Sequence, residues 1–387
     1  MATIAPDTPL PCEPELTGAA AAPNVAVVVS QLSYGGAERQ TVELLKALQG
    51  TPWAPRQIIC LSDDITPYGS AIRSLGYPLS VIPRTGGFDM QRVRRLRRQL
   101  LEDRIGIVHA VNWLAAAYCL VSAPRGIRIV TSIRNSRLPA TWIRRLMLRH
   151  LLRRSAAVMV NSESARSLML DQCRMSPDRV TLVRNGVDLE CLRKSAVPGA
   201  VRRELLIPEH APVVAYVGRN AKVKNIPLLL DVAERLLASR PNLHVVIAGE
   251  GLDRQILAGT HLDGERRVHC LGARQDIPSL LSDATVLVLT SNSEGTPNVV
   301  LEALAASVPV VATPVGDVAD LVPEGCGAIV PAEAHALAAA VERMLAAGSA
   351  HKPAFDFHAR RIVQSYSVPL MVSGTTNVWK HTATQAS

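Results

Sequence analysis

Aromatic residues are scarce in this chain of 387 residues: Phe, Trp and Tyr together make up 3% of it, although 48% of its residues are apolar. Aliphatic side chains must therefore fill most of its core, and the apolar share excludes a wholly disordered protein. The length predicts two domains, or one unusually large domain.

Cysteines with metal-site or redox spacing are absent. The seven cysteines include no Cys-x-x-Cys pair, and the two nearest along the chain, Cys173 and Cys191, are 18 positions apart. Neither a zinc motif nor a disulfide framework is expected, so we interpret the cysteines as free thiols of a reducing compartment. This favours a cytoplasmic protein.

Long apolar runs are also lacking, since none reaches the roughly 18 residues that a membrane-spanning helix needs. Residues 1–23 have no basic start, carry acidic residues and contain five prolines. That is not the pattern of a secretory signal, and we expect a disordered leader.

Motifs for resident cofactors and metals are missing as well. The sequence has no Gly-x-Gly-x-x-Gly, no Gly-Lys-Ser/Thr, no His-Glu-x-x-His and no Asp-x-Asp pair. We therefore predict no metal site and no cofactor.

Positive charge is concentrated in one block. The formal net charge is +9, yet Arg84 to Arg154 alone hold 16 Arg, no Lys and three acidic residues, a net +13, while the remainder carries −4. Such a block favours an anionic partner, such as phosphate, nucleic acid or an acidic membrane surface; a solvated helix face is the alternative.

From Asn24 onward, short β-branched runs alternate with longer amphipathic stretches. Most of the runs are continuously apolar, as in parallel strands buried on both faces. The predicted strands are Val25–Val29, Gln57–Leu61, Leu79–Ile82, Ile105–Ala110, Arg128–Ser132, Ala156–Val160, Val180–Val183, Val213–Val217, His244–Ala248, Arg267–Leu271, Ala284–Leu289, Val308–Ala312 and Ala328–Val330. The predicted helices are Ala37–Gln49, Asp89–Arg104, Pro139–Arg154, Glu163–Cys173, Ile226–Ser239, Ile277–Ser282, Val299–Ala306 and Ala334–Ala347.

This alternation predicts an α/β protein made of two doubly wound, Rossmann-like domains that face each other across a cleft. We place the domains at 24–195 and 205–357, and expect the weakly helical segment 358–387 to pack back on the first domain. Ligands of such folds lie beyond the carboxyl ends of the strands, so the site should lie in the cleft.

Two glutamates give the strongest chemical signal. Glu294 and Glu302 stand eight positions apart in SEGTPNVVLEALA, after a predicted buried strand. The turn at Gly295 and the helix after it offer backbone amides and a dipole to an anion, whereas the carboxylates suit hydroxyl groups. A nucleotide diphosphate sugar has both an anionic diphosphate and hydroxyl groups. The alternative interpretation of the segment is a capped helix with solvated glutamates.

A basic loop follows another strand, in the segment GRNAKVKN. Gly218 permits close approach of a ligand to the backbone, and Arg219 and Lys224 could neutralise a diphosphate. Lys222 is equally available on composition. Taken alone, the segment is also consistent with a basic surface loop.

Two weaker signals lie in the first half. Gly35 and Gly36 precede a helix, where backbone amides can admit phosphate or sugar. His109 ends a predicted strand on the side of the cleft, where it could act as a general base; a hydrogen-bonded structural histidine is at least as good an interpretation.

In this order, the motifs resemble glycosyltransferase family 4, the retaining nucleotide-sugar transferases with the GT-B fold. The resemblance extends from about Asn24 to the C-terminal region. It rests on GGAER (35–39), SIRN (132–135), NSE (161–163), NGVD (185–188), GRNAKVKN (218–225), GEG (249–251), SEGTPNVVLEALA (293–305) and PVVATPVG (309–316).

The resemblance implies a role for each matching position. Arg219 and Lys224 would bind the donor diphosphate, Glu294 the hydroxyls of the transferred sugar, and Glu302 the ribose hydroxyls. The other implied donor-binding positions are Gly218, Gly295, Thr296, Asn298 and Val299, with Arg274 near the nucleobase and Gly35 and Gly36 facing the diphosphate and the acceptor.

The family retains the anomeric configuration and usually needs no metal. Its members often carry a second histidine two positions after the first, where this chain has Val111. The catalytic role of that histidine therefore does not transfer simply to His109.

The basic block includes the predicted helix that ends at Arg154. Its apolar residues, with Trp142 at one edge and arginines elsewhere, suggest an interfacial helix that docks on an anionic membrane and receives a lipid-linked acceptor. The alternative is that its leucines lie in the core. We predict a cytoplasmic, membrane-peripheral transferase of cell-surface or exopolysaccharide synthesis, with a lipid-linked or saccharide acceptor.

Other classes of function remain as rivals. Nucleic-acid binding is disfavoured because the aromatic residues of the basic block are too scattered for a stacking platform. A sugar-nucleotide epimerase of similar fold would need no acceptor, and an inactive scaffold would bind the donor without turnover.

Overall fold

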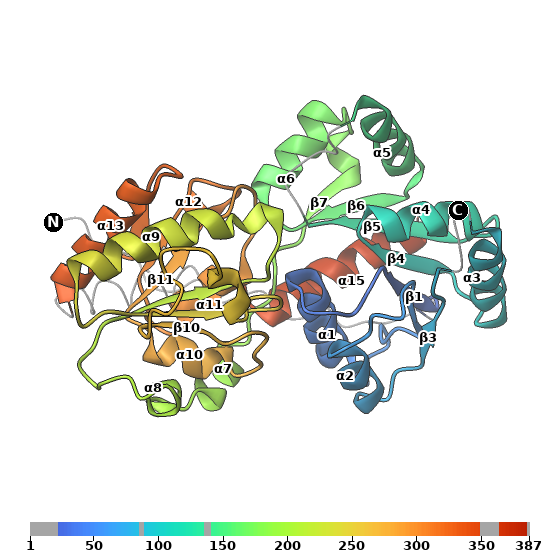
Figure 1. Cartoon of the computed structure of the whole chain (residues 1–387). Coiled ribbons are helices and arrows are strands. Elements are labelled where there is room, and N and C mark those ends of the chain that lie inside the picture. The colour runs from blue at the N-terminus through green and yellow to red at the C-terminus, as the bar shows by residue number, and fades with distance from the viewer. Residues whose placement is uncertain (1–21, 85–88, 135–140, 349–363, 385–387) are drawn as a thin grey trace, which may run out of the picture.

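The computed structural model describes residues 22–84, 89–134, 141–348 and 364–384. It has two α/β domains beside each other, each built on one parallel sheet with helices on both faces (Figure 1). Most of the expected leader, Asn135, the predicted helix start at 139–140 and residues 358–363 lie outside the described residues.

The first sheet has seven strands in the order β3-β2-β1-β4-β5-β6-β7. Buried aliphatic runs form it, as continuous apolar segments do when helices cover both faces of a parallel sheet. The strands are β1 (Val25–Val29), β2 (Gln57–Cys60), β3 (Leu79–Val81), β4 (Ile107–Val111), β5 (Arg128–Ile133), β6 (Ala157–Val160) and β7 (Val180–Leu182). The helices are α1 (Gly36–Leu48), α2 (Tyr68–Ser74), α3 (Met90–Glu102), α4 (Trp113–Ser122), α5 (Trp142–Arg154) and α6 (Glu163–Ser167).

The second sheet has six strands in the order β10-β9-β8-β11-β12-β13. Its strands are β8 (Val213–Val217), β9 (His244–Ala248), β10 (Val268–Cys270), β11 (Val286–Leu289), β12 (Val310–Ala312) and β13 (Gly327–Ile329). The helices that join the domains or cover this sheet are α7 (Leu189–Ser195), α8 (Ala200–Glu204), α9 (Ile226–Ser239), α10 (Ile277–Asp283), α11 (Asn298–Ala305), α12 (Val318–Leu321) and α13 (Ala334–Ala347).

Both sheets reverse their strand order at the same point of their topology. In the first sheet β1 lies between β2 and β4, and in the second β8 lies between β9 and β11. Ligands of open α/β sheets bind in the crevice at such a switch point. The segments after β1, β8 and β11 are the ones that carry the glycine pair, the basic loop and the two glutamates.

The C-terminal helix α15 (Val368–Thr384) returns to the first domain, where it lies beside α1 (Figure 1). Its Trp379 is fully buried in an apolar cluster that includes Val25 and Leu44. The chain therefore crosses from the second domain back to the first, and the last helix becomes part of the core of the first.

The sequence did not predict five of the helices: α2, α4, α7, α8 and α12. The segment WLAAAYCLVS forms α4, but it is apolar nearly all round and so shows no amphipathic period. The seven-residue α2 is too short to show one. The helix predicted from Glu163 is α6 followed by a single π-helical turn, Leu168–Gln172. Among the described residues, no helix has the length and apolar character needed to cross a bilayer.

Candidate active site

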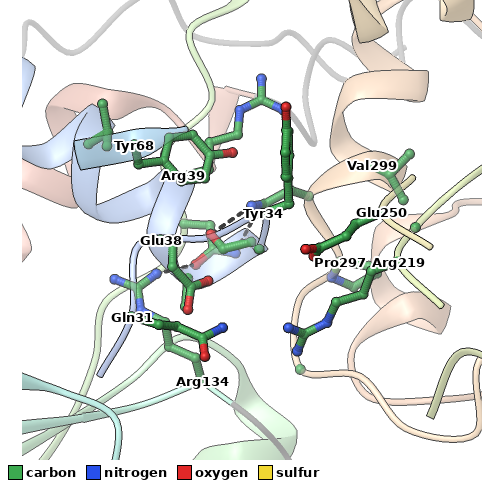
Figure 2. Close-up of a pocket in the computed structure, with 18 of the residues that line it drawn as sticks. Gln31, Tyr34, Glu38, Arg39, Tyr68, Arg134, Arg219, Glu250, Pro297 and Val299 are labelled. Atoms are coloured by element: carbon green, nitrogen blue, oxygen red, sulfur yellow. Dashed lines mark hydrogen bonds between the residues drawn. The ribbon is translucent and has the colours of Figure 1, made fainter. Parts of the chain in front are cut away.

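A cleft of about 1330 Å³ separates the two domains. Figure 2 shows side chains from both domains reaching into it. From the first domain these include Gln31, Tyr34, Glu38, Arg39, Tyr68 and Arg134, and from the second Arg219, Glu250, Pro297 and Val299. All the site residues predicted from the sequence, except His109, line this cleft.

Glu294 and Lys224 form an ion pair at the floor of the cleft. Lys224 Nζ lies 2.6 Å from Glu294 Oε1, and the hydroxyl of Ser291 donates to the same oxygen over 2.6 Å. Both charged side chains are largely buried. The structure also distinguishes the two lysines of the basic loop: Lys224 lines the cleft, whereas Lys222 is exposed and does not line it.

The segment between the two glutamates turns from β11 into α11. Pro297 is the N-cap of α11, and no side chain caps this N-terminus. The first helix of the chain, α1, begins in the same way after Gly35, again without a side-chain cap. Two helix N-termini without a capping side chain at the N-cap residue thus line one cleft, and in the first turn of α1 the carboxyl of Glu38 bonds its own backbone amide. Each terminus carries the partial positive charge that attracts an anion.

Asparagines of the first domain hold this turn in place. Asn185 Nδ2 donates to the carbonyl of Thr296 over 3.1 Å and to Asn298 Oδ1 over 2.7 Å. The hydroxyl of Thr296 in turn donates to the carbonyl of Asn161 over 2.9 Å. Because Asn161 and Asn185 belong to the other domain, these bonds fix the turn relative to both halves of the cleft.

Glu302 forms an ion pair across the cleft. Its Oε1 lies 2.6 Å from Nη1 of Arg39, a residue of α1 in the first domain, and only 5% of its side-chain surface is exposed. Burial raises the pKa of Glu302, while the charge of Arg39 opposes that rise. The same attraction raises the pKa of Arg39.

Arg219 belongs to a loop that is braced by the neighbouring segment GEG. The backbone amide of Gly218 donates to the carbonyl of Ala248 over 3.0 Å, and the backbone amide of Asn220 donates to the carbonyl of Glu250 over 2.8 Å. In Figure 2, the Arg219 side chain extends into the cleft from the side opposite to Glu38.

Two further charged side chains, Glu38 and Arg134, lie on the wall that the first domain contributes to the cleft. Burial raises the pKa of Glu38, whereas the charges of Arg219 and Arg134 oppose that rise. Burial lowers the pKa of Arg134 to about 10, and its Nη1 donates to Asn185 Oδ1 over 3.2 Å. This wall therefore presents a carboxyl group and a buried cation to the cleft.

Arg274 is held by two carboxylates at the edge of the cleft. It donates to both oxygens of Glu204, over 2.6 and 2.8 Å, and to both oxygens of Asp276, over 2.8 and 2.6 Å. The hydrogen bonds that it donates to Asp276 and Glu204 strongly raise the pKa of Arg274. Its guanidinium plane is thus fixed and charged.

The prediction that His109 ends its strand and faces the cleft is wrong. The strand begins and ends later than expected, at Ile107 and Val111, so that His109 lies in its middle. The imidazole is buried, bonds to the hydroxyl of Ser132 at 2.6 Å and packs edge-to-face on Trp379. Burial lowers its pKa to about 3. The position that reaches the cleft is Asn112, the first residue after the strand.

Several cleft residues received no role from sequence reasoning. Glu38, Arg39, Arg134, Asn161 and Asn185 all lie inside motifs that carried the family resemblance. The position of Arg134 was itself a signal, since a charged residue directly after a buried parallel strand points to the ligand crevice. Residues whose partners come from the other domain give no such signal.

Comparisons with known proteins agree with this architecture. The sequence model of Glycosyltransferase Family 4 matches residues 34–191, and that of Glycosyl transferases group 1 matches residues 211–347. The chain is 26% identical over 373 residues to the glycosyltransferase EpsF of Bacillus subtilis, covering 91% of this chain and 95% of EpsF. It is 31% identical over 283 residues to the alpha-D-kanosaminyltransferase of Streptomyces kanamyceticus, covering 65% of this chain and 71% of that enzyme.

The fold also matches a solved structure. HepE of Anabaena in complex with UDP-glucose superposes with a TM-score of 0.79, over 92% of this chain and 99% of HepE, at 18% sequence identity. At that identity the match concerns the fold alone. The two family matches, the kanosaminyltransferase and the paired parallel sheets together identify the chain as a glycosyltransferase of family 4, the group 1 glycosyltransferases, with the GT-B fold.

Proposed function

We propose that the protein transfers a sugar from a nucleotide diphosphate sugar to a lipid-linked or saccharide acceptor, with retention of the anomeric configuration. One observation carries the proposal. Glu294 and Glu302, which suit hydroxyl groups, lie in one cleft with Arg219, Lys224 and the N-terminus of α11, which suit a diphosphate. The donor complex of HepE has the same fold and supports this choice of donor.

In the proposed complex, each group binds one part of the donor. Arg219 and Lys224 take the diphosphate, together with amides of residues 295–299, and Glu294 accepts from hydroxyls of the transferred sugar. Glu302 accepts from the ribose hydroxyls, and the fixed guanidinium plane of Arg274 lies against the base. Gly218 lets the backbone approach the ligand, and Gly35 and Gly36 line the side where the acceptor meets the diphosphate.

The transfer then needs positioning and charge stabilisation rather than a protein nucleophile. The bond between C1 of the sugar and the phosphate oxygen breaks, and its electron pair stays on the departing nucleoside diphosphate. The acceptor oxygen forms the new bond to C1 on the same face, and its proton passes to an oxygen of the leaving phosphate. Arg219 and Lys224 stabilise the charge that develops there, so we propose that no metal is needed and that EDTA leaves the rate unchanged.

The experiment that tests the proposal is substitution of Glu294. Glu294→Ala should lower the release of nucleoside diphosphate from the preferred donor by at least about 10²-fold, since a group aimed at the reacting sugar is lost. Glu294→Gln keeps the size and shape of the side chain, so it distinguishes the effect of the lost charge from the effect of lost packing. Glu234→Gln, at an exposed position of α9, is the matched control. Turnover of Glu294→Ala near that of the control, with an unchanged melting temperature, would refute the site.

We also propose that the protein works at the cytoplasmic face of a membrane, in polysaccharide synthesis. The support is α5, which leaves apolar and basic side chains uncovered while burying Leu148 and Leu152 in the core. Exposed fractions on this helix are 72% for Trp142, 53% for Ile143, 57% for Leu146 and 60% for Met147. The helix thus anchors itself through two leucines and presents its other face outward.

Two neighbouring features make an anionic bilayer the proposed occupant of this face. Trp113 and Leu114 of the adjoining α4 are also exposed, and Trp113 lines the cleft, so an acceptor lipid could pass from the bilayer to the site. Exposed arginines surround the apolar patch, and each adds about 1 kcal/mol of attraction near an anionic surface. They are Arg144, Arg145, Arg153 and Arg154.

Vesicle sedimentation tests this docking. Replacement of those four arginines by Gln should abolish binding to vesicles of phosphatidylglycerol and phosphatidylcholine, and the unmodified protein should not bind phosphatidylcholine alone. A matched control neutralises four exposed arginines outside the block and should bind normally: Arg193, Arg203, Arg235 and Arg266. Equal binding of the two variants would refute the docking face.

A further inference from the structure

In the proposed donor site, the carboxylate that binds the ribose has its ion-pair partner in the opposite domain. Glu302 belongs to α11 of the second domain, and Arg39, on α1 of the first, donates to its Oε1 over 2.6 Å. The other carboxylate oxygen of Glu302 has no hydrogen-bond partner among the described residues, and the side chain lines the cleft. One oxygen is thus engaged by the protein while the other remains for a ligand.

The charge on Glu302 depends on its surroundings. A carboxylate accepts hydrogen bonds at both oxygens, whereas a carboxylic acid uses one oxygen as a donor and serves two hydroxyls poorly. Burial raises the pKa of Glu302 and Glu43 of α1 adds to that rise, while Arg39 is the cation that opposes it. Tyr68 of α2 and Cys191 of α7 are further titratable groups that act on Arg39. Burial raises the pKa of Tyr68 to about 12, so that it stays neutral.

The ion pair also reports on how the domains are placed. The N-termini of α1 and α11 meet directly, where the side-chain amide of Asn298 donates to the carbonyl of Gly36 over 3.3 Å. One turn further along α1, the side-chain amide of Gln40 exchanges hydrogen bonds of 2.9 and 2.7 Å with the backbone of Gly186 in the same domain, which holds α1 in place within the first domain. Arg39 lies on this turn of α1, and its ion pair with Glu302 joins the two domains, as the contact of Asn298 with Gly36 does.

We propose that Arg39 is a positioning residue for the donor nucleotide: from the first domain it keeps Glu302 of the second domain ionised and oriented toward the ribose. The inference rests on the proposed function, in which Glu302 receives the ribose hydroxyls. It adds that the nucleotide site draws on both domains, because the cation that faces Glu302 comes from the first domain. Arg39 acts through Glu302 and touches no part of the nucleotide.

The test is the pH dependence of nucleotide affinity. UDP, GDP and ADP are titrated calorimetrically into the unmodified protein, and the tightest binder is then used with Arg39→Gln at about pH 6 and about pH 8. Loss of Arg39 removes the cation that opposes the rise in the pKa of Glu302, so that the carboxyl group is more readily protonated at the lower pH. Relative to the unmodified protein, the affinity of Arg39→Gln should fall by at least about tenfold at the lower pH and recover in part at the higher one. The unmodified protein sets the reference profile, because the terminal phosphate of the nucleotide itself titrates near about pH 6.

Four further variants make the result specific. Arg39→Lys keeps the charge and should restore the profile of the unmodified protein, and Lys46→Gln, an exposed charge change on the same helix, should behave as the unmodified protein. Glu302→Gln cannot titrate, so it should bind weakly at both pH values, and adding Arg39→Gln to it should cause little further loss. A pH-independent loss in Arg39→Gln, or full additivity with Glu302→Gln, overturns the inference.

The failure of the proposed function gives a different result. If the unmodified protein binds none of the three nucleotides, or if Glu302→Gln binds as tightly as the unmodified protein, the donor site itself is wrong. If Glu302→Gln weakens binding while Arg39→Gln leaves affinity unchanged at both pH values, the donor site stands and only the role of Arg39 is refuted.

Discussion

Trp379→Ala tests whether the C-terminal helix is part of the core of the first domain. The side chain is fully buried, with its ring 5.6 Å from that of His109 and 6.2 Å from that of Trp53, centroid to centroid. A tryptophan buries on the order of 200 Å², worth about 5 kcal/mol of apolar transfer, and Trp→Ala changes in cores cost about 3–5 kcal/mol. For a domain of this size we expect its melting temperature to fall by about 6–20 °C.

Differential scanning calorimetry measures this, because it can separate the transitions of the two domains. Trp379→Phe should be milder, since the ring is kept and the buried indole N–H has no hydrogen-bond partner to lose among the described residues. Trp142→Ala is the matched control, because that side chain lies on the surface of α5. A loss in Trp379→Ala no larger than in Trp142→Ala, or a loss confined to the second domain, would contradict the placement of α15.

Three further predictions concern the strands and loops that support the cleft. Burial lowers the pKa of His109 to about 3, so the contribution of the neutral imidazole to stability is complete above its ordinary pKa of 6.5 and is lost as the pH falls. When the pH is lowered from about 6.5 to about 5, the free energy of unfolding in urea should therefore fall by about 2 kcal/mol less in His109→Asn than in the unmodified protein. Gly316→Ala should destabilise the second domain by about 1–3 kcal/mol in the same assay, because at φ +55° its Cβ would lie 2.4 Å from the carbonyl oxygens of Glu294 and Gly295. Asp317→Ala should weaken donor binding more than it lowers the melting temperature, because its carboxylate joins the domains by accepting from two amides of α6 in the first domain, over 2.8 and 2.9 Å. Equal stability of Gly316→Ala and the unmodified protein, or unchanged donor affinity of Asp317→Ala, would contradict these two predictions.

The sequence predicted much of the fold because its strands are buried on both faces. A run such as Val25–Val29 is apolar at every position, as is typical of a parallel strand that helices cover on both faces. An apolar run without alternation does not, however, show at which residue the strand begins or ends. Nothing in the apolar segment around His109 shows where the strand starts, so an error of one or two residues moved the imidazole from the core to the cleft in our prediction.

The cleft was predictable where one segment holds several functional groups together. Glu294, Gly295 and Glu302 come from one turn and one helix, so their spacing alone places them. Arg39 could not be assigned in this way, because its role depends on how one domain lies against the other. Local periodicity carries no information about that arrangement.

The central claim is that this cleft binds a nucleotide diphosphate sugar through its phosphates. Calorimetric titration with UDP-, GDP- and ADP-sugars tests it most directly, with the unmodified protein and an Arg219→Gln/Lys224→Gln variant. One donor should bind the unmodified protein, and its affinity should fall by at least about 10²-fold in the variant, since two charge-assisted contacts to the diphosphate are lost. Absence of binding by every donor, or equal affinity in the variant, would contradict the account.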